Sequence, residues 1–194
     1  MEETLIFIDE GFLSKLSKYF GEGKYIKIDY IKFANSLVKK QNLSCKHIFY
    51  YTAPPFQQTI PTKEERKRKE GYDKFIAKLS KNINITIREG RVQRLKFNND
   101  FKYKQKGVDT LMTIDLSHIR EDSPNIKKLI IVTSDTDFCP IIKDLEKRNI
   151  EVILYTYFDR KRNSPFSISN ELLNCCSKYV QLIKQDFEDS ILEK

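Results

Sequence analysis

Metal-binding side chains other than carboxylates are scarce in this sequence. Its 194 residues include four cysteines and two histidines, and no cysteines have the C-x-x-C spacing that zinc sites commonly use. The residues concerned are Cys45, Cys139, Cys175, Cys176, His47 and His118. A zinc site is therefore poorly supported, and we expect reduced thiols, most of them buried.

Long apolar segments are also missing. No stretch is long and apolar enough to cross a bilayer, and the N-terminus lacks a basic segment followed by an apolar one. No internal repeat or low-complexity linker divides the chain, whose length suits one domain or one domain with a short appendage. We therefore expect a soluble, cytoplasmic protein with no membrane partner.

Positive charge is in excess. The formal net charge is +8 and the isoelectric point is near 9.2. Such a surface attracts polyanions, although charge alone says nothing about fold. Nucleic acid is therefore the first partner to consider.

Apolar runs alternate with amphipathic stretches along the chain. Buried strands are predicted at Thr4–Ile8, His47–Ala53, Ile83–Glu89, Lys128–Thr133 and Ile150–Tyr155. The first strand is expected to lead into a loop at Glu10 and Gly11. Helices are predicted from Asp29 through Val38, from Lys63 to Leu79 after the cap Thr62, after Gly107, and from Pro140 to Arg148.

This alternation predicts a parallel or mostly parallel sheet with helices on both faces and right-handed crossovers. The stretch from Arg91 to Tyr103 could form an extended hairpin arm. Beyond Ser164, the sequence predicts a short helix capped by Ser169 or Asn170, and an edge strand at Tyr179–Ile183. The last residues are expected to form a mobile helix or a frayed end.

Four aspartates lie at or just beyond the ends of these elements: Asp9, Asp109, Asp135 and Asp137. Each alone could be a cap or turn residue, but one cap does not explain both Asp135 and Asp137. Because the ends of parallel strands meet at one edge of a sheet, the four could form one acidic cluster. Asp115 lies about 600° of helical rotation beyond Asp109, so it is expected to have an outer or structural role.

An acidic cluster on a basic protein suggests a metal-dependent nuclease. Mg²⁺ and Mn²⁺ prefer oxygen ligands, and carboxylates brought together without a cation repel one another. A divalent ion relieves that repulsion and can neutralise charge on a phosphodiester during its cleavage. No histidine base is required.

The predicted arm combines basic and aromatic residues. Its basic residues are Arg88, Arg91, Arg94, Lys96, Lys102, Lys104 and Lys106, and its aromatic residues are Phe97, Phe101 and Tyr103. Basic residues can follow a phosphate backbone while aromatic rings stack on unpaired bases. The alternative is a hairpin whose aromatic residues pack on the core. The segment from Lys63 to Glu70 also mixes both charge signs, which is typical of a solvated helix face, and its alternative role is to flank a phosphate backbone.

Three segments combine an apolar strand or a helix start with one or more of these aspartates. They are Ile6-Phe7-Ile8-Asp9, the stretch Gln105–Leu116 with Lys106-Gly107-Val108-Asp109, and Ile131–Pro140 with Ser134-Asp135-Thr136-Asp137. Together they resemble the NYN domain, a branch of the PIN-like nuclease superfamily, and in particular its LabA-like members. The likeness extends from about Thr4 to Tyr155, and the second and third motifs carry most of its specificity.

The resemblance implies an α/β, PIN-like (Rossmann-like) three-layer sandwich around a central, mostly parallel sheet. It implies a domain over residues 1–160, with a C-terminal extension over 161–194 that packs on it or trails from it. It also implies a divalent-metal-dependent endoribonuclease acting on RNA, single-stranded by preference, as a possible homodimer. Carried over by position, the catalytic residues that bind Mg²⁺ or Mn²⁺ would be Asp9, Asp109, Asp135 and Asp137, with Asp115 as a supporting acid. Glu10 and Ser134 are further candidates for support, and the basic arm offers RNA contacts from Arg91, Arg94, Lys104 and Lys106.

The sequence departs from the family pattern at two positions. Phe12 occupies the position where the family usually has asparagine, and Ser134 occupies that of a usual glycine. Loss of a polar group near a metal is expected to weaken or retune its binding, and Glu10 is the candidate to supply an oxygen instead. The alternatives are a catalytically weak module that binds RNA or protein, and a phosphatase-like hydrolase, which would need an aspartyl nucleophile.

Overall fold

The structure, a computed structural model, describes residues 1–98, 100–161, 164–167 and 169–193. Its strands are β1 (Glu2–Asp9), β2 (Leu43–Thr52), β3 (Ile85–Glu89), β4 (Arg91–Phe97), β5 (Asp100–Lys106), β6 (Lys128–Val132), β7 (Glu151–Thr156) and β8 (Lys178–Gln181). Its helices are α1 (Glu10–Phe20), α2 (Tyr30–Lys39), α3 (Lys63–Leu79), α4 (Val108–Ser117), α5 (Ile119–Asp122), the 3₁₀ turn η1 (Thr136–Phe138), α6 (Cys139–Lys147), α7 (Asn170–Asn174) and α8 (Lys184–Glu188).

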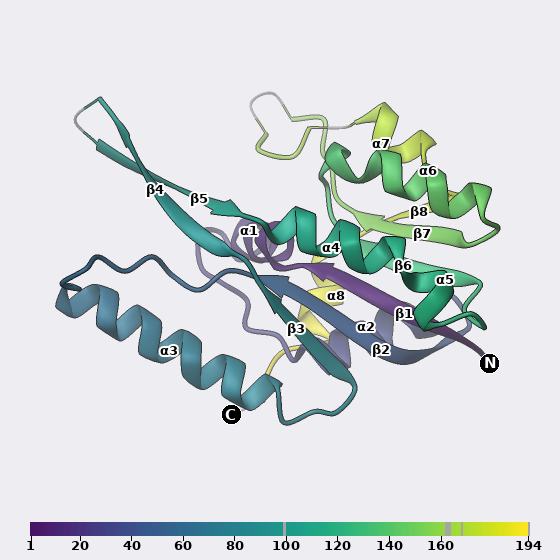
Figure 1. The fold of residues 1–194 in the computed structure, drawn as a ribbon, viewed down its shortest axis with the longest axis horizontal. Coiled ribbons are helices and arrows are strands. Elements are labelled where there is room, and N and C mark those ends of the chain that lie inside the picture. The colour runs from purple at the N-terminus through teal and green to yellow at the C-terminus, as the bar shows by residue number, and fades with distance from the viewer. Residues whose placement is uncertain (99, 162–163, 168, 194) are drawn as a thin grey trace.

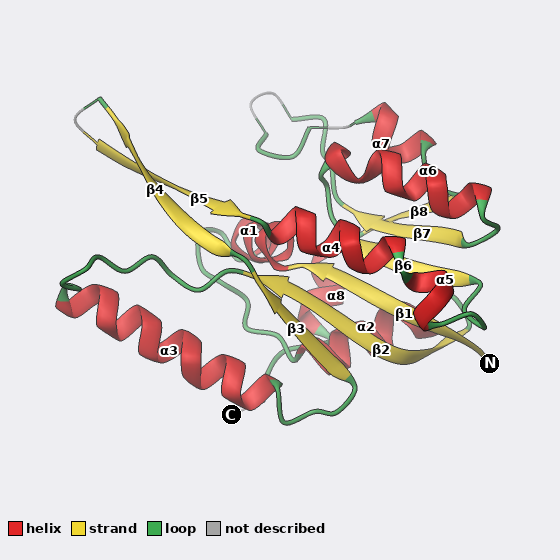
Figure 2. Ribbon diagram, in the orientation of Figure 1, coloured by secondary structure: helices red, strands yellow, loops and turns green. Residues whose placement is uncertain are grey.

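A six-stranded parallel sheet forms the centre of the molecule. Its strand order is β3-β2-β1-β6-β7-β8, and every neighbouring pair is parallel. Helices cover both faces, and the antiparallel β4–β5 hairpin projects from the sheet edge as a separate arm (Figures 1 and 2). The predicted α/β class with a parallel central sheet is confirmed.

Side-chain alternation along β1 divides the core into two layers. Ile6 and Ile8 point into a cluster with residues of α1, α2 and α8, whereas Leu5 and Phe7 point into one with residues of α4, α5, α6 and α7. All four side chains are at most 3% exposed. Strands buried on both faces explain why the sequence shows continuous apolar runs instead of alternation.

The helix caps confirm two predictions and correct one. The Asp29 carboxylate accepts hydrogen bonds from two backbone N–H groups of α2, and Thr62 forms a capping box with Glu65 at the start of α3. The expected loop after β1 is wrong, because Asp9 caps α1 directly. Gly11 suggested a turn, but Leu13 and Leu16 bury the apolar face of a helix there.

The end of the chain differs from the predicted mobile helix or frayed end. β8 pairs with β7 at the edge of the sheet, as predicted, and α8 then packs back on the core. Phe187 of α8 is 0% exposed, and the centre of its ring lies 5.4 Å from that of the Phe20 ring and 5.5 Å from that of the Phe33 ring. None of the described helices has both the length and the apolar character needed to cross a bilayer.

Candidate active site

Three of the predicted carboxylates line one open cavity at the carboxyl edge of the sheet. Asp9 ends β1, Asp135 follows β6 and caps η1, and Asp109 lies in the first turn of α4. The cavity has a volume of about 610 Å³ and also contacts Ser134 and Lys104. Segments up to 126 residues apart in the sequence thus place acidic groups around one space.

Asp9 is the most constrained of these groups. Its Oδ1 accepts a hydrogen bond from the Phe12 N–H at 3.2 Å, and its Oδ2 accepts one from the Thr133 hydroxyl at 2.9 Å. Burial raises the pKa of its carboxyl from 3.8 to about 6, with smaller contributions from the negative charges of Asp109 and Asp135, against the lowering effect of the two hydrogen bonds. The carboxylate is thus held in place at an electrostatic cost.

Asp109 and Asp137 extend the electrostatic coupling. Burial raises the pKa of Asp109, the charges of Asp135 and Asp137 raise it further, and Lys104 lowers it. Asp137 is exposed, and its backbone N–H donates to Asp135 Oδ1 at 2.9 Å. The fold therefore places Asp109 within electrostatic reach of Asp9, Asp135 and Asp137, whereas Asp137 itself does not line the cavity.

The donor set fits a hard divalent cation in kind, because its groups are carboxylates with mutual repulsion that a cation would relieve. As the side chains stand, however, no group of three or more His, Cys, Asp or Glu residues in the described part of the chain is spaced to hold a metal ion. Direct coordination of one ion by three of these carboxylates would require them to move closer together, whereas one or two carboxylates with bound waters can hold Mg²⁺.

Two residues near Asp9 were not predicted from the sequence. Gln105 lines the cavity, and a Cβ atom on Gly11 would lie 3.0 Å from Gln105 Oε1 and 3.3 Å from Asp9 Oδ1. Gly11 therefore leaves room for the Gln105 amide beside the carboxylate. No local pattern indicated this, because the approach depends on how β5 packs over the start of α1.

The two departures from the family pattern have different surroundings. Phe12 is 5% exposed, and its ring contacts that of Phe166 edge-on at a centroid distance of 6.3 Å. Its side chain thus belongs to the apolar core, although its N–H still binds Asp9. Ser134 is exposed at the cavity.

Glu10 is partly buried next to Asp9. Burial raises the pKa of its carboxyl, a hydrogen bond with Ser14 lowers it, and the Asp9 charge raises it. The Thr52 hydroxyl lies 3.5 Å from Glu10 Oε2, at the limit of a hydrogen bond. Glu10 is not among the cavity-lining residues in the described part of the chain, so an oxygen from it would reach the site only after a change of side-chain conformation.

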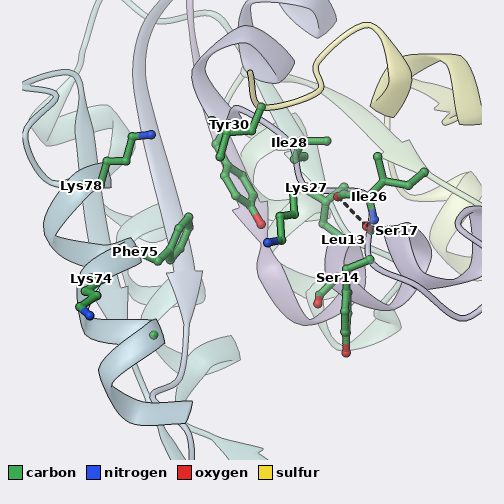
Figure 3. A pocket seen from close by; sticks show the side chains of 13 residues that line it. Leu13, Ser14, Ser17, Ile26, Lys27, Ile28, Tyr30, Lys74, Phe75 and Lys78 are labelled. Carbon is green, nitrogen blue, oxygen red and sulfur yellow. Dashed lines mark hydrogen bonds between the residues drawn. The ribbon is translucent and has the colours of Figure 1, made fainter. Parts of the chain in front are cut away.

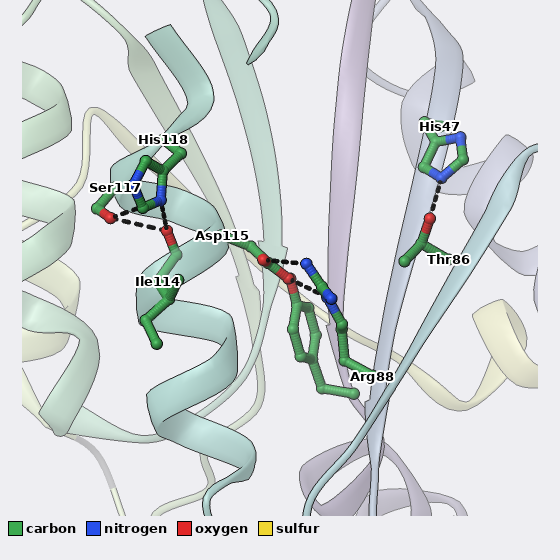
Figure 4. Close-up of polar contacts among 8 residues, drawn as sticks. His47, Thr86, Arg88, Ile114, Asp115, Ser117 and His118 are labelled. Carbon is green, nitrogen blue, oxygen red and sulfur yellow. Dashed lines mark hydrogen bonds and ion pairs between the residues drawn. The ribbon is translucent and has the colours of Figure 1, made fainter. Parts of the chain in front are cut away.

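Asp115 lies on another side of α4 from the cavity and joins three elements. It forms an ion pair with Arg88, whose Nε and Nη2 donate at 2.9 and 2.7 Å (Figure 4). It also accepts a hydrogen bond from the Tyr51 hydroxyl at 2.8 Å. The Asp115 side chain is 10% exposed. These contacts connect α4 to β2 and β3.

Both histidines lie away from the acidic cavity. His47 forms a hydrogen bond with the Thr86 hydroxyl, and His118 forms one with the Ile114 carbonyl (Figure 4).

The β4–β5 arm is exposed. Phe97, Phe101 and Tyr103 are 54%, 47% and 52% exposed, so the alternative of aromatic residues packed on the core is wrong. Two glycines shape the base of the arm. Gly107 has φ +82°, in the left-handed region, and a Cβ on Gly90 would lie 2.5 Å from the Lys106 carbonyl oxygen.

The predicted RNA-binding residues are all on this arm. Arg91 pairs with Lys106 at its base, Arg94 lies farther out, and Lys104 lines the acidic cavity.

A second cavity of about 490 Å³ lies between α3 and α1, lined by residues that include Leu13, Tyr30, Lys74, Phe75 and Lys78 (Figure 3). None of the predicted acids lines it.

Comparison with known proteins identifies a family and a similar fold. The NYN domain family matches residues 3–183. The chain belongs to the NYN domain family. This membership suggests a PIN-like nuclease. The fold is also that of a crystallised protein of unknown function from Vibrio parahaemolyticus, with 18% identity, a TM-score of 0.56, and coverage of 98% of this chain and 96% of that one. A search of curated proteins finds no match.

Proposed function

We propose that this NYN domain is a ribonuclease that uses Mg²⁺ or Mn²⁺ to hydrolyse phosphodiester bonds of single-stranded RNA. The observation that carries the proposal is the convergence of Asp9, Asp109 and Asp135 on one cavity, where burial and mutual repulsion raise the pKa values of Asp9 and Asp109. Retaining such groups is costly for stability and typical of a functional site.

The side chains around the cavity have distinct roles in this proposal. Asp9, Asp109, Asp135 and Asp137 would hold the cation, which when bound supplies an activated water and neutralises charge on the phosphodiester. The Thr133 hydroxyl and the Phe12 N–H orient Asp9. Lys104, close enough to lower the pKa of Asp109, would contact a substrate phosphate at the same rim.

The second candidate is a module that binds RNA without efficient cleavage. The observation in its favour is Phe12, which places an apolar core side chain where the family usually has asparagine. This candidate predicts RNA binding that weakens with salt, without metal-dependent turnover.

Removal of the metal tests the choice between these candidates. Labelled single-stranded RNA is expected to be cleaved in Mn²⁺ or Mg²⁺, to remain intact in EDTA, and to be cleaved again when metal is restored in excess. Hydrolysis of p-nitrophenyl phosphate, measured alongside, should be negligible; turnover of that ester alone would favour a phosphatase. Cleavage that continues in EDTA would contradict a metal-dependent mechanism, and salt-sensitive binding without cleavage would favour the second candidate.

The Asp115→Ala variant tests whether Asp115 supports the fold or the chemistry. Loss of the carboxylate leaves the buried Tyr51 hydroxyl without an acceptor and breaks the Arg88 ion pair, so the free energy of unfolding should fall by roughly 2 kcal/mol. Cleavage by the folded protein should change by less than about threefold, since Asp115 does not line the cavity. Urea unfolding and initial rates measure both, with the exposed Asp122→Ala as control. An unchanged stability with a large loss of rate would give Asp115 a direct role.

A further inference from the structure

One face of the arm carries an ordered set of aromatic and basic side chains. In the β4–β5 pairing Arg94 is opposite Tyr103, and Lys96 is opposite Phe101. Directly paired residues share a face, as do residues two apart on one strand, so these four lie on the same face. Phe97, which is opposite Asp100, lies on the other face.

Phe56, from the loop between β2 and α3, adds a third ring to this face. The Arg94 guanidinium carbon lies 5.0 Å from the centre of the Phe56 ring and 4.5 Å from that of Phe101. The Tyr103 ring lies 5.6 Å from the Phe56 ring. Tyr103, Phe56, Arg94 and Phe101 therefore form a continuous row in which each side chain contacts the next. About half of the surface of Phe101 and of Tyr103 remains exposed.

This row begins at the acidic cavity. Tyr103 lines the cavity, whereas Phe101 lies two residues farther out along β5, about 7 Å away at the rise of a strand. A strand of substrate leaving the cavity along the arm would therefore meet Tyr103 first and Phe101 next.

The charge of the arm favours a polyanion. Residues 91–106 include six basic residues and a single acidic one, Asp100. The six are Arg91, Arg94, Lys96, Lys102, Lys104 and Lys106, and within the described part of the chain none of them forms an ion pair. By the pairing, Arg94 and Lys96 lie on the face of the aromatic row, and the other four lie on the opposite face. The charge therefore attracts a polyanion to the whole arm, and the row of rings is what distinguishes this face.

We infer that this face of the arm, and not the opposite one, is the path of single-stranded RNA, with successive bases stacked on Tyr103 and Phe101 and the intervening phosphates held by Arg94 and Lys96. The inference rests on the proposed function in taking RNA as the substrate. Stacking uses the faces of bases, which a duplex keeps covered, and every base has such a face. The arm therefore selects single strands and tolerates different sequences.

The absence of tryptophan from the chain allows a direct test. Phe101→Trp and Phe97→Trp each introduce a sole tryptophan at a similarly exposed position, on opposite faces of the arm. Titration with oligouridylate of about ten nucleotides, in EDTA so that no cleavage occurs, is expected to quench the fluorescence of Phe101→Trp and to leave that of Phe97→Trp nearly unchanged. An RNA duplex of the same length should quench neither.

Alanine variants give the matching affinities. Phe101→Ala should weaken oligouridylate binding about tenfold or more, and Phe97→Ala less than about twofold. Equal quenching at the two positions, binding without quenching of Phe101→Trp, absence of RNA binding, or equal binding of duplex would each overturn the inference.

These measurements are independent of catalysis. If Phe101→Trp is quenched but the wild-type protein cleaves no RNA with Mn²⁺, the ribonuclease proposal fails and the binding path stands. If RNA is cleaved but Phe101→Trp is not quenched, the binding path fails alone.

Discussion

Asp135→Asn is expected to lower the rate of RNA cleavage about a hundredfold or more, with little change in stability. Asparagine has the same size and keeps an oxygen that can accept the Asp137 N–H bond of the η1 cap. What it removes is a negative charge that faces Asp9 and Asp109 across the cavity. A cation held by these oxygens would lose a negatively charged ligand, which a neutral amide oxygen replaces poorly.

Initial rates of cleavage of end-labelled RNA, measured with saturating Mn²⁺, would show the effect. The matched control is Asp144→Asn on α6, which removes a carboxylate that is 43% exposed and paired with Arg148 at i,i+4, and which should cleave at the wild-type rate. Equal rates for wild type and Asp135→Asn would remove this cluster from the mechanism.

Asp9→Asn is expected to make the metal-free protein more stable and to abolish cleavage. The folded protein raises the pKa of the Asp9 carboxyl from 3.8 to about 6, so folding disfavours its charged form. This penalty is absent below about pH 4, grows as pH rises toward 6, and is fully present at pH 7. At 1.36 kcal/mol per pKa unit, the rise from 3.8 to about 6 means that the substitution should add about 3 kcal/mol to the free energy of unfolding at neutral pH.

Urea unfolding in EDTA at pH 4 and pH 7 tests the sign as well as the size. The gain from Asp9→Asn should appear at pH 7 and be small at pH 4. Asp29→Asn is the control, because Asp29 also caps a helix but lies outside the acidic cavity, and it should change stability little at either pH. A gain of equal size at both pH values would assign the effect to packing and not to charge.

Metal should reverse the order of stability. A ligand that binds only the folded state stabilises it by about 2.7 kcal/mol at a hundred times its dissociation constant. Mn²⁺ should therefore stabilise the wild type strongly and Asp9→Asn weakly. A site that is destabilising when empty is the usual trade-off between stability and function.

Local sequence patterns predicted the elements that depend on local interactions. The apolar runs of β1, β2, β6 and β7 and the caps Asp29 and Thr62 are readable from neighbouring residues alone. Helix α1 was missed because Gly11 favours a turn in a sequence-based prediction. The structure gives a different reason for glycine at this position: a side chain there would crowd the Gln105 amide, which lies next to Asp9.

The sequence by itself determined the alternation of strands and helices, the basic charge, and the positions of aspartates at the ends of those elements. Tertiary structure decided which residues meet: that Asp9, Asp109 and Asp135 share a cavity while Asp115 pairs with Arg88, that Phe56 joins the arm, and that α8 covers the core. The physical reason is the distance along the chain over which each kind of interaction acts. Periodicity and capping act over a few residues, whereas these contacts join segments far apart in the chain and form only once the sheet and its helices have packed.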